Sequence, residues 1–177
     1  MYSKAKIAGH PLHPMLVGLP VTLYLVTLVA FVVSARTADP FWFRVGAYAN
    51  LAAVITAAVA AIPGFVDWAF GIPRGTPAKE TGAVHMALNV AALLVFLLNL
   101  VQQWGHRADL VPRVGLSVVL PLIGVLITVF AGFLGWKLVQ THHVGVDLTP
   151  EQERQEPHPS PHVDRSAGHP THGPQIG

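Results

Sequence analysis

The sequence contains no cysteine among its 177 residues. This absence excludes a disulfide framework, cysteine-ligated iron–sulfur clusters, zinc sites built from cysteine and covalent haem attachment through a CxxCH motif. Any metal ion or haem must therefore be held by histidine, methionine, carboxylate or backbone oxygen. The sequence also lacks a phosphate-binding loop, a dinucleotide fingerprint and a nucleophile–base pair, so it does not indicate an enzyme that acts on its own.

Charged residues are scarce as well. They make up 11% of the chain, whereas a soluble domain has about 25%. Hydrophobic residues make up 52%, the mean hydropathy is +0.50, and the apolar residues gather in four blocks nearly free of charge. We predict membrane helices over residues 15–34, 45–66, 82–102 and 114–139, because each block is close to the roughly 20 residues that cross a bilayer.

The loops between these blocks are short, so neighbouring helices should be antiparallel. The predicted fold is an all-α integral membrane four-helix bundle, up-down-up-down, over residues 1–147. Residues 148–177 are rich in histidine, proline and polar residues, and we expect this tail to be disordered. The sequence shows no convincing internal repeat.

Four crossings place both termini on the same side of the membrane, and we expect a multi-pass protein of the bacterial inner (plasma) membrane. Basic residues on the side of the termini slightly outnumber those on the other side, which favours cytoplasmic termini. The two sets are Lys4, Lys6, Arg74, Lys79 and Lys137 on the side of the termini, and Arg36, Arg44, Arg107 and Arg113 on the other. No basic run indicates nucleic acid, so the expected partners are the lipid bilayer and a second copy or a redox-complex subunit.

Polar residues able to bind a metal or haem fall mostly at one end of the predicted bundle. The ionisable ones on the side of the termini are His10, His13, Asp67, His85, His142 and His143. Asn89 lies one helical turn beyond His85 on the same face. Ionisable groups at membrane depth are costly, and by default they indicate function.

Three interpretations of this layer remain open. Two imidazoles from different helices could clamp a b-type haem, with His13, His85, His142 and His143 as candidate ligands. A divalent metal ion or a proton could instead use His10, His13, Asp67 and His85. The third interpretation is that these side chains only bond to headgroups, backbone and water. Asp67 would then cap the Pro63–Gly64 turn or pair with Lys79 or Arg74.

Five segments, taken in order, resemble a bacterial membrane family known as domain of unknown function 2231. They are the Gly9–Pro14 segment with the following Leu16–Pro20, then Gly64–Trp68, Thr81–Asn89, Gly132–Gly135 and His142–Val146. The resemblance implies a four-helix membrane domain and places motif residues on His10, His13, Asp67, His85, Asn89 and one or both of His142 and His143. Relatives with a Rieske-type domain imply redox work, although this chain has no such domain.

The sequence thus favours a polytopic membrane protein that binds haem b or a divalent metal ion in a respiratory or electron-transfer setting. Two alternatives stay open. One is a structural or assembly subunit of a membrane complex without a cofactor, and the other is a proton- or metal-coupled transporter.

Overall fold

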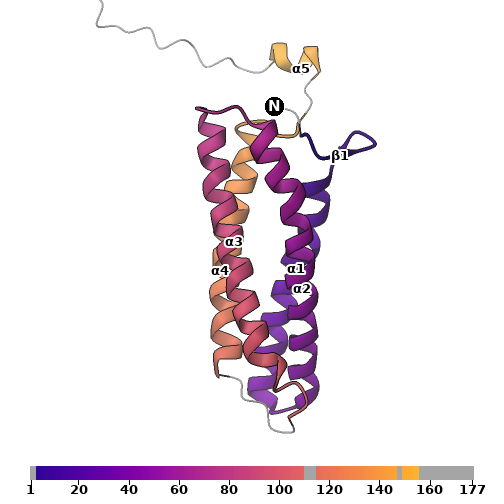
Figure 1. Ribbon diagram of the computed structural model, residues 1–177, viewed down its shortest axis with the longest axis vertical. Coiled ribbons are helices and arrows are strands. Elements are labelled where there is room, and N and C mark those ends of the chain that lie inside the picture. Colours follow the sequence, from indigo (N-terminus) through magenta and orange to yellow (C-terminus); the bar gives the residue numbers. More distant parts are fainter. Residues whose placement is uncertain (1–2, 110–114, 147–148, 156–177) are drawn as a thin grey trace, which may run out of the picture. The chain divides into compact units, whose positions relative to one another are not determined.

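The computed structural model describes residues 3–109, 115–146 and 149–155. The chain divides into two compact units, residues 1–147 and 148–177. The first unit contains a two-stranded hairpin, four long helices and one turn of π-helix (Figure 1). Its elements are β1 (Lys6–Ile7), β2 (His10–Pro11), α1 (Leu12–Thr37), α2 (Pro40–Val66), η1 (Asp67–Gly71), α3 (Pro77–Trp104) and α4 (Gly115–Gln140).

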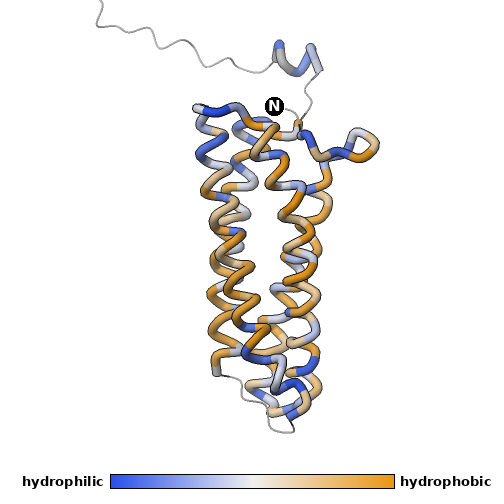
Figure 2. The backbone as a smooth tube through the Cα atoms, viewed as in Figure 1, coloured by the Kyte–Doolittle hydropathy of each residue, from blue (hydrophilic) through white to orange (hydrophobic). Residues whose placement is uncertain are grey.

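The prediction of an all-α bundle with four membrane-length helices is confirmed. Each of the four long helices is long and apolar enough to cross a bilayer. Figure 2 shows hydrophobic residues along most of the length of these helices. Large apolar side chains are exposed all around the bundle, such as Val101, Phe130 and Phe133. In water, such extensive exposed apolar surface would favour aggregation. It suits a surface that is in contact with lipid.

The helices α2 and α3 begin five residues earlier than the predicted 45 and 82, because polar caps extend them. The side chain of Asp39 accepts a hydrogen bond from the backbone N–H of Phe41 at 2.8 Å, and Pro40 opens α2. Thr76 caps α3 in the same way through Lys79, with Pro77 in the first turn. A capping side chain followed by proline is a strong start signal that a hydropathy block does not register.

Both chain ends also carry structure that the sequence did not predict. The N-terminal arm forms the β1–β2 hairpin, in which Ile7 pairs with His10. His10 therefore lies on a strand and does not share a helix face with His13. In the second unit, a short helix, α5 (Pro150–Gln155), lies in the segment predicted to be disordered, and residues 156–177 of that predicted tail lie outside the described residues.

Two helical hairpins build the bundle, α1 with α2 and α3 with α4. In the first, the ring of Phe31 lies against Gly46, and in the second the ring of Phe96 lies against Gly124. A Cβ atom at either glycine would come within 3 Å of the phenylalanine ring. Glycine at these positions therefore sets how closely the two helices of each hairpin approach, as small residues do in membrane proteins.

The two hairpins also share a matching pair of positions, one histidine and one aromatic residue on the first helix of each. Tyr24 follows His13 along α1 at the same interval as Phe96 follows His85 along α3. The equivalent residues meet each other, since Tyr24 and Phe96 stack with ring centroids 3.7 Å apart and planes 8° apart, and the two histidine rings are also neighbours. The two hairpins therefore meet through corresponding positions on α1 and α3.

Candidate functional site

Asp67, the first residue of η1, anchors the N-terminal arm to the end of α2. Its carboxylate accepts hydrogen bonds from the Ser3 hydroxyl at 2.8 and 2.9 Å, from the backbone N–H of Lys4 at 2.6 Å and from that of Ala5 at 2.9 Å. The backbone N–H of Leu12 in turn donates to the carbonyl of Ala5 at 2.9 Å. Asp67 therefore holds the start of the chain across this end of the bundle.

We expect Asp67→Ala to release the arm, because a carboxylate that accepts several hydrogen bonds is a strong local anchor. The amide protons of Lys4 and Ala5 should exchange with solvent roughly tenfold faster or more, measured by hydrogen–deuterium exchange in detergent. Asp39→Ala is the matched control, since Asp39 caps a helix elsewhere and should leave exchange in the arm unchanged. Equal exchange in both variants would mean that other contacts hold the arm.

His13 lies in the first turn of α1 and reaches the neighbouring helix. Its Nδ1 atom is 2.8 Å from the backbone carbonyl oxygen of Ala60 in α2. Gly64, one turn further along α2, makes room for the ring, since a Cβ there would be 2.7 Å from Nδ1 of His13. A carbonyl oxygen only accepts, so Nδ1 carries the proton and Nε2 keeps its lone pair.

His85 in α3 repeats this arrangement. Its Nδ1 atom is 2.8 Å from the carbonyl oxygen of Ala131 in α4, and a Cβ at Gly135 would be 3.0 Å from the ring. The side-chain amide of Asn89 donates to the carbonyl of His85 at 2.8 Å, and its nitrogen is 3.5 Å from Nδ1 and 3.2 Å from Nε2. These similar distances place the amide over the ring face, because a position in the ring plane would overlap Cε1. Asn89 therefore contacts both ring nitrogens of His85 through its amide nitrogen.

The structure brings His13 and His85 together. Their ring centroids are 6.2 Å apart and the ring planes are nearly perpendicular, at 85°. Both rings are half-buried, both donate Nδ1–H to a helix carbonyl, and each comes from a different hairpin. Two imidazoles, each fixed through Nδ1 to a helix carbonyl, thus lie side by side at one end of the bundle.

The other three histidines of the predicted site lie outside the two helices that carry this pair. His10 is exposed, and its Nδ1 atom lies 2.9 Å from the carbonyl oxygen of Ala8. His142 follows α4, and its Nε2 atom is buried with no hydrogen-bond partner among the described residues. His143 has a positive φ of 50°, which places it in the turn that ends α4. In the part of the chain that the structure describes, no three His, Cys, Asp or Glu side chains group closely enough to hold a metal ion together.

Trp68 of η1 fixes the start of α3, which carries His85. Its indole N–H donates to the carbonyl oxygen of Lys79 at 3.1 Å. The ammonium of Lys79 donates to the carbonyl of Trp68 and lies 4.1 Å from the centre of its ring, a cation–π contact. Lys79 therefore pairs with Trp68, and Asp67 is left to the N-terminal arm.

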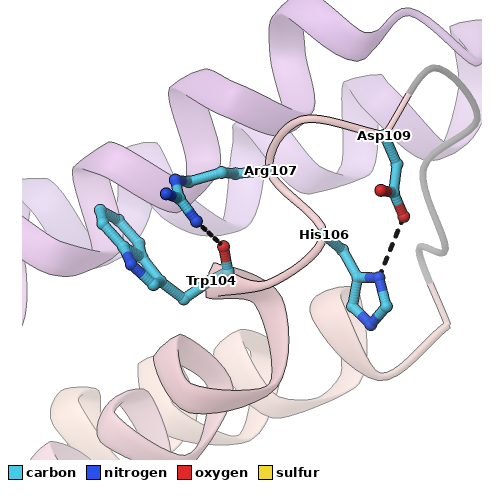
Figure 3. Close-up of polar contacts among 4 residues, drawn as sticks. All are labelled: Trp104, His106, Arg107 and Asp109. Atoms are coloured by element: carbon cyan, nitrogen blue, oxygen red, sulfur yellow. Dashed lines mark hydrogen bonds and ion pairs between the residues drawn. The ribbon is translucent and has the colours of Figure 1, made fainter.

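The opposite end of the bundle has its own polar contacts, between α3 and the turn that follows it. Figure 3 shows the guanidinium of Arg107 donating to the carbonyl of Trp104, while Nδ1 of His106 lies 3.0 Å from a carboxylate oxygen of Asp109. Arg107 also lies over the Trp104 ring, 4.4 Å from its centre. His106 therefore lies at the end of the bundle away from the polar layer.

Four membrane-length helices with a polar layer at one end define a small multi-pass membrane protein. The chain belongs to the family described as predicted membrane protein (DUF2231), whose model matches residues 9–148. The resemblance stated from the sequence is therefore confirmed. No curated protein and no solved structure matches the chain.

The acceptors of the two histidines were missed by reasoning from the sequence. Ala60 and Gly64 in α2, and Ala131 and Gly135 in α4, form two short stretches in which alanine precedes glycine by one helical turn. The small residues of both helices were visible in the sequence, but nothing there connected each pair with a histidine on the preceding helix. Ser3 was missed for a simpler reason, since an isolated serine near a chain end carries no signal.

Proposed function

We propose that His13 and His85 are the axial ligands of a b-type haem, and that the protein transfers electrons in a membrane. The observation that carries this proposal is the pair of neighbouring imidazoles, each fixed by an Nδ1–H bond to a helix carbonyl, which makes Nε2 the nitrogen that each would offer to a metal. Histidines that ligate metals almost always donate the other ring N–H to such an acceptor, which fixes the ring and makes it more basic.

The spacing of the rings supports a single metal centre between them. Two metal–nitrogen bonds of about 2 Å account for most of the separation of 6.2 Å between the ring centroids, and the two ring radii make up the rest. A haem iron takes four ligands from its porphyrin and needs only two from the protein. A pair of histidines therefore suits haem better than a bare divalent ion, which would need further protein ligands.

The residues around the pair would position the haem and tune it. Ala60 and Ala131 supply the carbonyls that orient the imidazoles, and Gly64 and Gly135 keep the adjacent helix surfaces free of side chains. When bound, the haem supplies one-electron chemistry. We also propose that the protein resides in a bacterial inner membrane, with cytoplasmic termini and a redox partner.

An oxidised-minus-reduced visible spectrum of the purified protein in detergent, with metal analysis of the same sample, tests the proposal. A Soret band with sharp α and β bands on reduction is the expected result, because two imidazoles give low-spin haem. A colourless protein with stoichiometric metal would replace the haem with a metal ion. A colourless and metal-free protein, after expression with haem and metals supplied, would make a structural or assembly subunit the leading interpretation.

A further inference from the structure

A second polar layer lies deep inside the bundle, away from the histidine pair. Thr27 of α1, Asn50 of α2 and Asn99 of α3 are each 0% exposed. Each lies three residues from a member of the buried cluster formed by Tyr24, Ala53 and Phe96. In all three helices the step leads away from the histidine end, toward the α1–α2 and α3–α4 connections. Because residues three apart share a helix face, the three polar side chains form one layer directly beneath the cluster.

The two asparagines in this layer have unmet hydrogen-bonding capacity. The amide nitrogen and oxygen atoms of Asn50 and Asn99 are all buried, and none has a hydrogen-bond partner among the described residues. The hydroxyl of Thr27 donates to the carbonyl of Leu23 at 2.8 Å, which leaves its lone pairs as acceptors. Unpaired amides are costly in any apolar interior, and more so in a membrane, where lipid offers no hydrogen bonds.

The unpaired amide atoms of Asn50 and Asn99 determine which kind of ligand can bind between them. The orphan groups include both N–H donors and carbonyl acceptors, so the occupant must both accept and donate hydrogen bonds. A cation would satisfy only the oxygen atoms, and an anion only the N–H groups. Water satisfies both kinds of group, and buried water in proteins typically bridges otherwise unpaired polar atoms.

A pocket lies on one side of this layer, and an aromatic stack lies on the other. Gln103 lies one turn beyond Asn99 on α3, and together with His106 and Leu116 it lines a pocket of about 300 Å³ at the end of the α3–α4 connection. In the other direction, the rings of Tyr24 and Phe96 stack 3.7 Å apart between the two hairpins. Along α3, the polar layer therefore lies between the pocket beside Gln103 and the Tyr24–Phe96 stack.

We infer that Asn50 and Asn99 bind water at the inner end of a half-channel, which opens beside Gln103 and ends at the Tyr24–Phe96 stack. The half-channel brings water, and with it exchangeable protons, to about 20 Å from the level of His13 along α1, given a rise of 1.5 Å per residue. It does not depend on the proposed haem, because it is built from other residues on the far side of the aromatic stack.

Thiol accessibility tests this inference directly, because the chain has no cysteine of its own. Asn99→Cys and the control Ala92→Cys place single thiols at buried positions of α3, on opposite sides of the stack. In proteoliposomes, a charged methanethiosulfonate reagent should modify the first roughly tenfold faster than the second, since it reacts with the thiolate and needs water to reach it. Equal, slow modification of both, with Gln103→Cys still reactive, would overturn the half-channel.

A second measurement needs no substitution. In protein labelled with ¹⁵N at asparagine and embedded in bilayers, magnetisation should pass from water to the side-chain amides of Asn50 and Asn99. Transfer to Asn89 alone, which is exposed at the histidine end, would show that the inner layer is dry and would overturn the inference.

Discussion

The His85→Ala protein is expected to insert into the membrane and fold, and to lose the absorption of the proposed haem. The variant lacks one of the two histidines that would hold the haem, and His13 alone would remain of the pair. Haem per protein, measured from the Soret band after purification, should fall below about a tenth of the wild-type value. His13→Ala should give the same loss, because the two histidines occupy matching positions in the two hairpins.

His10→Ala is the matched control for this experiment. His10 lies only three residues before His13, but it is exposed and its Nδ1 atom is close to Ala8. The variant should therefore retain its haem. His142→Ala tests the remaining candidate for the second haem ligand. Nε2 of His142 is buried and has no hydrogen-bond partner among the described residues. If His142→Ala loses the haem and His13→Ala keeps it, the second ligand is His142 and not His13.

The Gly124→Ala protein is expected to be less stable than the wild type by about 1–3 kcal/mol, the usual effect of overpacking a core. The added Cβ would lie 2.4 Å from Cε2 of Phe96. The ring of Phe96 cannot retreat, because it is fully buried and stacks on Tyr24. The helices α3 and α4 must therefore separate, which disturbs the centre of both hairpins. The thermal unfolding midpoint in detergent measures this effect.

Gly132→Ala in the same helix is the control, since a Cβ at Gly132 would meet nothing within 4 Å. Alanine is the better helix former by up to about 1 kcal/mol, so this variant should be as stable as the wild type or slightly more stable. An equal loss of stability in both variants would show that the contact between Phe96 and Gly124 does not limit the packing of α3 on α4.

The fold was predictable because a membrane imposes its requirements on composition. Four blocks of roughly 20 residues, almost free of charge, fit membrane helices, because a helix satisfies all backbone hydrogen bonds within one segment. The ends of the helices were less predictable, because Asp39 with Pro40 and Thr76 with Pro77 extend α2 and α3 into polar sequence. The matching positions in the two hairpins, His13 with Tyr24 and His85 with Phe96, were also overlooked in the sequence. Their match rests on contacts between rings and small residues, and Tyr24 and Phe96 can correspond without being identical.

The candidate site was predictable in its residues and much less so in its geometry. Helix parity placed all six ionisable residues at one end, but it did not separate the paired His13 and His85 from the exposed His10. Asp67 shows the limit most plainly. The sequence offered a turn cap or a lysine or arginine as its partner, whereas the partners are Ser3 and two backbone N–H groups of the arm. A sequence pattern does not show which backbone N–H groups donate hydrogen bonds, because every residue except proline has one.

The placement of His13 and His85 in different hairpins also bears on how the protein is made. During synthesis, the α1–α2 hairpin is complete before α3 begins, and it already contains the contact of His13 with Ala60. Each half carries one of the two proposed ligands, His13 or His85, so a half alone has only one side of the proposed cofactor site. Cofactor capture must then wait until the second half has been inserted and has docked against the first. A bound cofactor would thus mark a chain whose biogenesis is finished.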